Sequence, residues 1–183
     1  SLCQKYEENR DGEWKWFENI VTYCNSILPW SLILACKVTC EKKFFDAARE
    51  SLEFLESVTF RHGYFKPVGC NGWYIKGGEP AEYDEQTVEA CETALTYFEA
   101  YELTGDMEYL QKAKICHAWY DGLNSKGIPL VEKDSGACFD GLTAHGVNLN
   151  MGAESLISYV ISCLKMSDVY ASEMDYGRLN TAT

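Results

Sequence analysis

The sequence is poor in basic residues and in histidine, and it lacks any long hydrophobic run. Lysine and arginine together number 16 against 28 acidic residues, with 3 histidines, which leaves a formal charge of -12. Nucleic acids and anionic membranes bind clustered positive charge, so we expect neither as a partner. The longest apolar tract, 27–36, is broken by Pro29 and Ser31 and is too short to span a bilayer. The first residues also lack the apolar segment of a signal peptide.

Motifs that identify an enzyme by spacing alone are absent as well. The chain contains no GxSxG, no P-loop, no GxGxxG and no HExxH. The sequence therefore gives no sign of a serine nucleophile elbow, a nucleotide-binding loop or a metalloprotease helix, and we expect no cofactor. No CxxC or nearby histidine completes a zinc-ligand set, so we expect no metal site.

The cysteines are odd in number, and most of them lie inside apolar helical patterns. Free cysteine behaves as a small hydrophobic residue, so these side chains are typical of core thiols in a reducing compartment. We therefore predict a cytoplasmic protein. The 9 cysteines are Cys3, Cys24, Cys36, Cys40, Cys70, Cys91, Cys116, Cys138 and Cys163.

Apolar side chains recur at three- and four-residue spacing along much of the chain, which predicts an all-α fold. With 46% apolar and 14% aromatic residues, the 183 residues can bury one sizeable core, so we predict a single helical domain over 1–183. Helices are predicted over 29–40, 44–58, 86–103, 107–121 and 154–166, with an approach segment or short helix over 13–23. The helix 29–40 is apolar nearly all round, which predicts burial. Glycines and aromatics over 59–84 predict a hairpin-like excursion, and the tail 167–183 is predicted to be irregular.

A repeat supports an array of antiparallel helix hairpins. Thr39, Phe44, Phe45, Ala48 and Phe54 recur 65 positions later as Thr104, Tyr109, Leu110, Ala113 and Trp119. Generic helix patterning is the alternative explanation. In an array of hairpins, the long loops 60–83 and 123–150 both follow a second helix and emerge at the same end. The array can be half of an (α/α) toroid, a small open array or a fragment of a longer polypeptide, and the absence of an initiator methionine predicts a missing upstream part.

The loop 132–155 is the first candidate for a binding site, because it is long and dense in polar side chains and glycine. Asp140 and Glu154 are candidate catalytic carboxylates, and His145, Asn148 and Asn150 are candidate hydrogen-bonding residues for a polar ligand. Each has a structural alternative. Asp140 can accept hydrogen bonds within a turn, Glu154 can stabilise a helix N-terminus, and the amides can satisfy the loop backbone.

A second group of candidates lies before the helix 86–103 and near the start of the chain. Asp84 and Glu85 can face a pocket or simply stabilise the helix N-terminus. Two facing carboxylates suit general acid and base catalysis, one to protonate a leaving group and one to activate water or attack carbon. Trp73 and Trp16 offer flat aromatic faces for a ligand, although core packing is the alternative for Trp16.

Several motifs together resemble one family. YDEQTVEA, TGD, AWYDGLNSKGIPLVEKDSGACFDGL and GVNLNMGAES, with WFENIVTYCNSILPWSLILA and FKPVGCNGWYIKGGE upstream, are similar to the helical domain at the carboxyl end of bacterial and archaeal group-1 (GT4-like) glycosyltransferases. The resemblance covers about residues 14 to 166. It implies an (α/α)6-toroid type of fold, here a partial toroid with its long loops at one end, and a role connected with sugars.

The sequence therefore predicts a carbohydrate-handling helical domain of a glycosyltransferase-related protein, which needs a missing N-terminal domain or partner chain. Whether it is an enzyme is left open. The predicted catalytic residues are Asp84, Asp140 and Glu154, and the predicted substrate-binding residues are Trp73, His145, Asn148, Asn150, Glu85 and Trp16. One alternative is an independent glycosidase, lyase or epimerase of the toroid class, and another is a non-catalytic helical-repeat interaction module.

Overall fold

The computed structural model describes the backbone of residues 1–180 and the side chains of residues 1–171. Within this part of the chain the helices are α1 (Leu2–Asn9), α2 (Ile27–Thr39), α3 (Lys42–Thr59), α4 (Thr87–Thr104), α5 (Met107–Ala118) and α6 (Ala153–Asn180). The strands are short: β1 (Ile20–Val21), β2 (Tyr74–Ile75), β3 (Glu85–Gln86), β4 (Gly141–Thr143) and β5 (Gly146–Asn148). The prediction of a mostly helical fold is confirmed.

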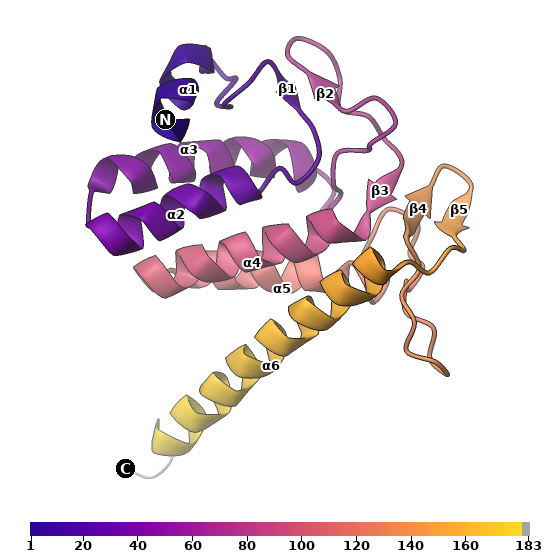
Figure 1. Cartoon of the computed structure of the whole chain (residues 1–183). Coiled ribbons are helices and arrows are strands. Elements are labelled where there is room, and N and C mark those ends of the chain that lie inside the picture. The colour runs from indigo at the N-terminus through magenta and orange to yellow at the C-terminus, as the bar shows by residue number, and fades with distance from the viewer. Residues whose placement is uncertain (181–183) are drawn as a thin grey trace.

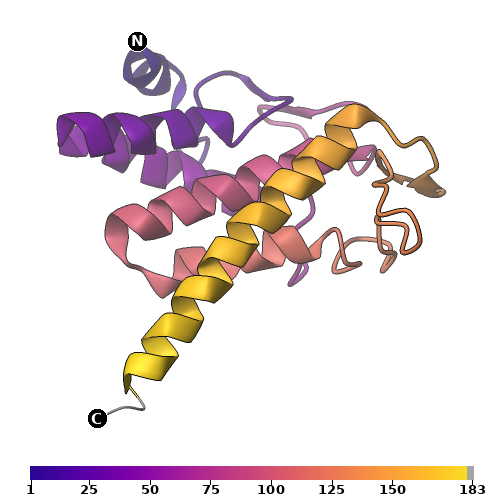
Figure 2. The ribbon, with the colours of Figure 1, turned by 60° about the horizontal axis from the view of Figure 1, so that its bottom comes forward.

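The helices form two layers built from antiparallel hairpins. Helix α2 pairs with α3, and α4 pairs with α5. Helices α2, α4 and α6 lie in the front layer of Figure 1, where α4 contacts α2 on one side and α6 on the other, while α3 and α5 lie behind. We call α2, α4 and α6 the inner helices. Figure 2 shows that α6 crosses the hairpin α4–α5 obliquely and extends beyond it at its C-terminal end.

The repeat predicted from the sequence is reproduced at the turn of each hairpin. Cys40 and Gly105, which end α2 and α4, both have left-handed backbone conformations, with φ of 58° and 73°. The hydroxyls of Thr39 and Thr104 accept from the amides two residues later, at 3.2 and 3.1 Å. The same side-chain and backbone chemistry therefore closes both hairpins.

Two buried clusters form the core on either side of α4. One lies between α1, α2, α3 and the segment 14–21, and it contains Trp16 and Phe17. The other lies between α4, α5, α6 and the segment 119–142, and it contains Trp119 and Tyr120. Burying aromatic side chains of this size contributes a large part of the hydrophobic stabilisation. The long segments outside the helices therefore belong to the core.

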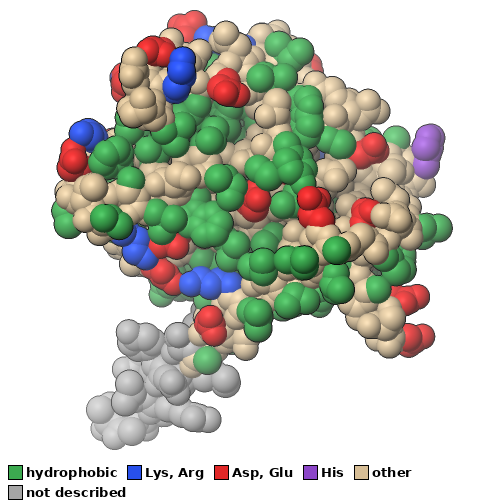
Figure 3. Space-filling view, in the orientation of Figure 1, with side chains coloured by type: hydrophobic (Ala, Val, Ile, Leu, Met, Phe, Trp, Pro, Cys, Tyr) green, Lys and Arg blue, Asp and Glu red, His purple; other side chains and the backbone are tan. Residues whose placement is uncertain are grey.

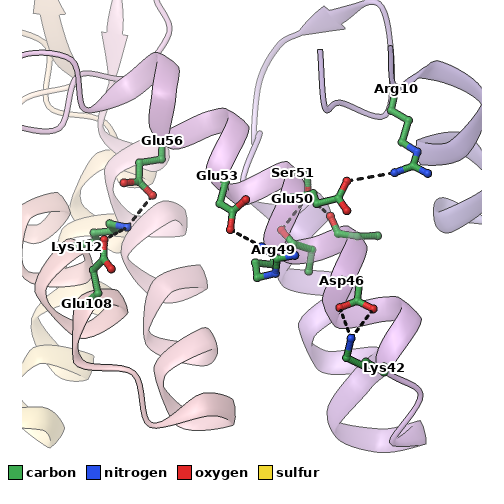
Figure 4. Close-up of polar contacts among 12 residues, drawn as sticks. Arg10, Lys42, Asp46, Arg49, Glu50, Ser51, Glu53, Glu56, Glu108 and Lys112 are labelled. Carbon is green, nitrogen blue, oxygen red and sulfur yellow. Dashed lines mark hydrogen bonds and ion pairs between the residues drawn. The ribbon is translucent and has the colours of Figure 1, made fainter. Parts of the chain in front are cut away.

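Ion pairs join the outer helices to their neighbours at the surface (Figure 4). Lys112 of α5 contacts Glu56 of α3 at 2.7 Å, and Arg10, next to α1, contacts Glu50 of α3 at 3.2 Å. The Arg10–Glu50 pair is partly exposed, and pairs of this kind contribute little net stability, whereas Lys112 is mostly shielded from solvent. Both pairs fix orientation between elements that the core already holds together.

The structure differs from the predicted elements in four places. Helix α1 was not predicted, whereas the segment 13–23 after it has no helix and is the approach segment that was one of its two predicted possibilities. The excursion around Tyr74–Ile75 pairs with Ile20–Val21 rather than with itself, because the two short strands align antiparallel. Helix α2 is not buried all round, since Val38 is 84% exposed. Helix α6 continues through 167–180, which we predicted to be irregular, while residues 181–183 lie outside the described part of the chain.

None of the helices in the part of the chain that the structure describes has the length and hydrophobicity needed to cross a membrane.

Candidate functional site

The N-terminal ends of the three inner helices lie at one end of the molecule, together with the loops that precede them (Figure 1). Antiparallel hairpins produce this arrangement, because each inner helix is entered from the end where the previous outer helix finishes. The strands β3, β4 and β5 form a small antiparallel sheet at this end, with Glu85 opposite Leu142 and Leu142 opposite Val147. The sheet ties the loop before α4 to the loop before α6.

Glu89, in the first turn of α4, is a buried acid at the end of the molecule where the inner helices begin, and it contacts the turn before α2. Its carboxylate accepts from the Cys24 amide at 2.6 Å and from the Asn25 side-chain amide at 2.9 Å. Only 2% of Glu89 is exposed. Burial raises the pKa of Glu89 to about 7, although these hydrogen bonds partly oppose the effect. Glu89 therefore holds the turn before α2 and takes up a proton close to neutral pH.

Glu92 lies one helical turn after Glu89 and is partly buried. Burial raises its pKa, a hydrogen bond with the Cys24 thiol opposes this rise, and the negative charge of Glu154 adds to it. Its Oε2 atom is buried and has no hydrogen-bond partner among the described residues. Glu92 is therefore a carboxyl group that holds its proton more tightly than an exposed glutamate does, and one of its oxygens is buried without a hydrogen-bond partner among the described residues.

Glu154, at the start of α6, is exposed and contacts Tyr23, which lies just before α2. The Tyr23 hydroxyl donates to Glu154 Oε2 at 2.7 Å. The Tyr23 ring lies edge-on to the Trp73 indole, with ring centroids 6.4 Å apart. We call Glu89, Glu92 and Glu154 the acid cluster. Residues from the start of α2, from the loop before α4 and from α6 meet around it.

Asp140 has a different environment from the one predicted. Its carboxylate accepts from the Gly152 amide at 2.6 Å, from the Ser155 hydroxyl and from the Asn150 side-chain amide. Partial burial acts to raise its pKa, but the three hydrogen bonds outweigh it, so the pKa of Asp140 is lowered. The carboxylate therefore binds the backbone amide of Gly152, just before α6, and the hydroxyl of Ser155 in its first turn, which is the turn alternative named above.

Glu85 is fully buried beside the second core cluster. Trp119 Nε1 donates to its Oε2 at 3.0 Å, and the Ser125 hydroxyl donates to its Oε1. Burial raises the pKa of Glu85, against the effect of these two hydrogen bonds. With 0% exposure, Glu85 links β3 to the segment after α5 and presents no surface to a ligand.

The remaining predicted residues are placed as follows. Trp16 is 1% exposed and packs against Phe17 and Phe54 in the core, which is the alternative considered for it. Asp84 is partly buried, and its backbone carbonyl accepts from the Cys70 amide at 2.9 Å. The segment before Cys70 passes so close to the residue before Asp84 that position 69 requires glycine, because a Cβ atom there would lie 2.2 Å from the Tyr83 carbonyl oxygen.

The hairpin β4–β5 carries two more predicted residues to the rim. His145 is exposed in its turn, and Asn148 is exposed at the end of β5. The Asn148 side-chain oxygen accepts from the Asn150 amide at 3.1 Å. The side-chain amide of Asn150 is occupied by Asp140, so Asn150 stabilises the loop.

The acid cluster contains two residues that sequence reasoning missed, Glu89 and Glu92, together with Tyr23 and Cys24 beside it. One signal was present. Cys24 and Glu89 are 65 positions apart, the period of the repeat, and Glu154 follows Glu89 by the same interval. Among the residues that the structure describes, no group of three His, Cys, Asp or Glu side chains is arranged to hold a metal ion.

Comparisons with known proteins bear on the fold. No protein-family model matches the chain, and no curated protein matches it in sequence. Among solved structures, it is similar to a family 76 glycoside hydrolase from a bovine Bacteroides thetaiotaomicron strain, with a TM-score of 0.50 and 14% identity. The match covers 69% of this chain and 26% of the hydrolase chain. At this identity the similarity concerns the fold alone, and the chain is a mostly helical, partial (α/α) toroid.

Proposed function

We propose that this chain forms part of the wall of a carbohydrate-active toroid and that it binds a sugar at the acid cluster. The supporting observation is that Glu92 and Glu154 lie near each other in unlike environments, beside the exposed ring of Tyr23 and the half-buried indole of Trp73. Glu92 is partly buried with a raised pKa, whereas Glu154 is exposed and accepts from Tyr23. Two acids in contrasting environments are typical of an acid and base assignment.

The chemistry that this pair supports best is hydrolysis of a glycosidic bond. Glu92, in its protonated form, donates its proton to the glycosidic oxygen as the bond to the anomeric carbon breaks. Glu154, as the carboxylate, takes a proton from the water molecule whose oxygen bonds to that carbon, or attacks the carbon itself. The thiol of Cys24 lies next to Glu92 and can form a hydrogen bond with either the protonated or the ionised carboxyl group of Glu92.

Side chains around the acid cluster give the sugar its contacts in this proposal. Trp73, close to Tyr23, provides an aromatic face for the apolar side of a pyranose. Asn148 and His145, exposed on the hairpin β4–β5, form hydrogen bonds to hydroxyl groups at the rim, and Asp84 lies in the loop between Trp73 and α4. Asp140 and Asn150 support the start of α6, and we no longer assign contacts with the sugar to Glu85 or Trp16.

The chain works, in this proposal, as part of a larger carbohydrate-active assembly in the cytoplasm. A glycosyltransferase-related polypeptide with an additional N-terminal domain is the assembly that the sequence motifs favour. An assembly that acts as a glycosidase is favoured by the similarity of fold to a glycoside hydrolase, of whose chain this protein spans 26%. All 9 cysteines are free thiols, which suits a reducing compartment.

Binding and hydrolysis of a panel of mono- and oligosaccharides test the proposal. Titration calorimetry and release of reducing ends should detect binding, turnover or both in the wild-type protein. Glu92→Gln and Glu154→Gln should abolish turnover and leave binding within a few fold, whereas Trp73→Ala should weaken binding. Glu13→Gln changes an exposed acid in the segment before β1 and serves as the control. Full turnover in both cluster variants, or no sugar bound by the wild type, would refute the proposal.

A further inference from the structure

A cavity lined by three basic side chains lies between the C-terminal end of α3 and the loop that joins α3 to β3. The basic residues are Arg61, His62 and Lys66, and the buried residues Val58 and Val68 belong to the apolar part of the lining. The cavity has a volume of about 240 Å³. Sites for drug-sized ligands usually measure roughly 300 to 1,000 Å³, so this cavity suits a small ligand or one end of a larger ligand.

Basic side chains are scarce on this chain, which has a formal charge of -12. On the face shown in Figure 3, the Lys and Arg side chains are few and lie mostly beside acidic ones. The cavity is different because its basic residues come from only six consecutive positions, 61–66, and line one hollow. A local concentration of positive charge attracts anions even when the whole molecule is acidic.

Lys66 is held in place at the cavity. Its backbone amide donates to the Thr59 carbonyl at 2.8 Å, which ties it to the end of α3. Its ammonium group lies 5.1 Å from the centre of the Tyr83 ring, and only 12% of its side chain is exposed. An ammonium group shielded from water to this degree needs an acceptor of opposite charge beside it.

The acceptor that Lys66 has in this structure is the carboxylate of Glu82. The Glu82 side chain is 73% exposed, in contrast to that of Lys66. Glu82 can therefore turn into solvent without opening the core, and an ion pair with so exposed a partner contributes little net stability. The carboxylate is a replaceable occupant of this position.

The other two basic residues act on the same carboxylate. The hydrogen bond with Lys66 contributes most to a lowered pKa of Glu82, against the effect of partial burial. The positive charges of Lys66, His62 and Arg61 add to this lowering. Arg61 Nε donates to the Ser57 carbonyl at 3.2 Å, and a guanidinium group held through Nε still presents its terminal nitrogens to an oxyanion.

We propose that this cavity is an oxyanion-binding site, in which a phosphate or carboxylate group of a small ligand takes the place that the Glu82 carboxylate occupies here. Lys66 supplies a fixed point charge, and Arg61 supplies a planar set of donors that matches two oxygens. Glu79, the other acid that lines the cavity, opposes the anion, so the affinity is modest.

The site is separate from the acid cluster. None of Glu89, Glu92 and Glu154 lines the cavity. Pro67 and Val68 line it on one side and also line a much smaller buried space that reaches Glu89. Oxyanion binding therefore does not depend on the sugar chemistry proposed above, and either proposal can fail without the other.

NMR titration of the full chain with inorganic phosphate, and separately with glucuronate, tests the site. Sodium chloride keeps the ionic strength constant, and glucose serves as the neutral ligand. At least one of the two anions should shift the amide signals of 61–66 and 79–82 with saturation at millimolar concentration, and glucose should not. The anion that binds more tightly identifies the oxyanion as a phosphate or a carboxylate.

Two substitutions at exposed positions should change the affinity in opposite directions. Arg61→Gln should weaken binding by about fivefold or more, because a charge-assisted pair of hydrogen bonds is lost. Glu82→Gln should strengthen it by about threefold or more, because the competing carboxylate is removed. The matched controls are Lys133→Gln and Glu13→Gln, which make the same changes of charge at exposed positions that do not line the cavity.

Both controls should keep the wild-type affinity, and circular dichroism should show wild-type helix content in all four variants. Absence of saturable binding with both anions would overturn the proposal. Equal weakening by Arg61→Gln and Lys133→Gln would do so as well, because the anions would then respond only to net charge. Unchanged affinity in Glu82→Gln would show that this carboxylate does not occupy the site.

Discussion

The Tyr23 hydroxyl donates a hydrogen bond to the Glu154 carboxylate at 2.7 Å across 131 positions of sequence. Tyr23 lies just before α2, and Glu154 lies at the start of α6, so the contact spans α4 and joins the two flanking inner helices at the site end. Its acceptor belongs to the acid cluster, and its donor ring contacts Trp73. One hydrogen bond therefore couples the geometry of the candidate site to the arrangement of the inner helices.

Replacing Tyr23 by phenylalanine should remove this bond and keep the ring. Hydrogen bonds to charged groups contribute more than neutral ones, but Tyr23 is 41% exposed, so we expect the free energy of unfolding to fall by about 1 kcal/mol. Sugar affinity, if the proposed site is correct, should fall in the same variant. Chemical denaturation of Tyr23→Phe alongside Tyr64→Phe, a partly buried tyrosine in the loop after α3, measures the difference. Equal free energies of unfolding for the two variants would show that the hydrogen bond between Tyr23 and Glu154 does not stabilise the fold.

The burial of Glu89 predicts a dependence of stability on pH. Its pKa is raised from 4.5 to about 7, so the folded chain binds more protons than the unfolded chain between these values. The contribution of Glu89 to the free energy of unfolding is fully present below pH 4.5 and is lost as pH rises to 7. The free energy of unfolding changes by about 3 kcal/mol over this range. The unpartnered Oδ1 of Asn25, beside Glu89, can accept the proton of the neutral acid if the Asn25 amide turns over.

Glu89→Gln should flatten this part of the stability profile. The amide has the shape of the protonated acid and no charge to bury, so the variant should equal the wild type near pH 5 and exceed it near pH 8. Urea denaturation at both pH values provides the measurement, and Glu13→Gln, an exposed acid, is the matched control. Parallel profiles for Glu89→Gln and the wild type would show that Glu89 titrates as an ordinary surface acid.

The helical framework could be predicted from sequence because apolar spacing and turn chemistry both act locally. The sequence Thr104–Gly105–Asp106 separates the predicted helices 86–103 and 107–121 and has residues typical of a helix end and a helix start, and the Asp106 carboxylate accepts from the amide two residues later, at 2.9 Å. The length of α6 was missed because its C-terminal half lacks a regular apolar stripe. A helix can continue there without one when its first half is anchored, as α6 is by Ser155, Ser162 and Met166 in the buried layer.

The candidate site was only partly predictable, because its contacts join residues that are distant in sequence. Glu154 and Trp73 were predicted, and both lie at the acid cluster. Glu89 and Glu92 were missed, since acids inside a helix usually face solvent and the partners that bury Glu89 come from the turn before α2. Asp140 was predicted to be catalytic from its glycine-rich surroundings, but the backbone of one of these glycines, Gly152, binds its carboxylate, and a Cβ atom there would lie 3.0 Å from Asp140 Oδ1.

Asp140→Ala tests this structural role. Loss of a capping carboxylate leaves the amide of Gly152 and the hydroxyl of Ser155 without their acceptor, and should cost about 2 kcal/mol of unfolding free energy. The pKa of Asp140 is lowered in the folded chain, so its contribution is present above its usual value of 3.8 and is lost as pH falls below it. Asp134→Ala, at an exposed position in the same loop, is the control. Unchanged stability with loss of sugar binding would instead restore the catalytic assignment.

Replacing cysteine by glycine should have opposite effects on the free energy of unfolding at two positions near the first hairpin turn. Cys40 has φ of 58°, a left-handed conformation that costs a side chain with a Cβ atom about 1 kcal/mol, and glycine occupies the equivalent position 105. Cys40→Gly should therefore raise the free energy of unfolding by up to about 1 kcal/mol. Cys36→Gly, one turn earlier inside α2, should lower it by roughly 0.3 kcal/mol, because glycine is a poorer residue than cysteine in a helix interior.

Gly105→Ala completes the test of the repeat. A Cβ atom at position 105 would have no neighbour within 4 Å, so any loss of stability comes from the left-handed backbone and not from a clash. We expect a loss of about 1 kcal/mol, equal in size and opposite in sign to the gain from Cys40→Gly. Thermal denaturation of the three variants under reducing conditions provides the comparison. If Cys40→Gly destabilised the protein as much as Cys36→Gly, the two turns would differ in energy despite their matching geometry, and the hairpins could not be treated as equivalent units of the toroid.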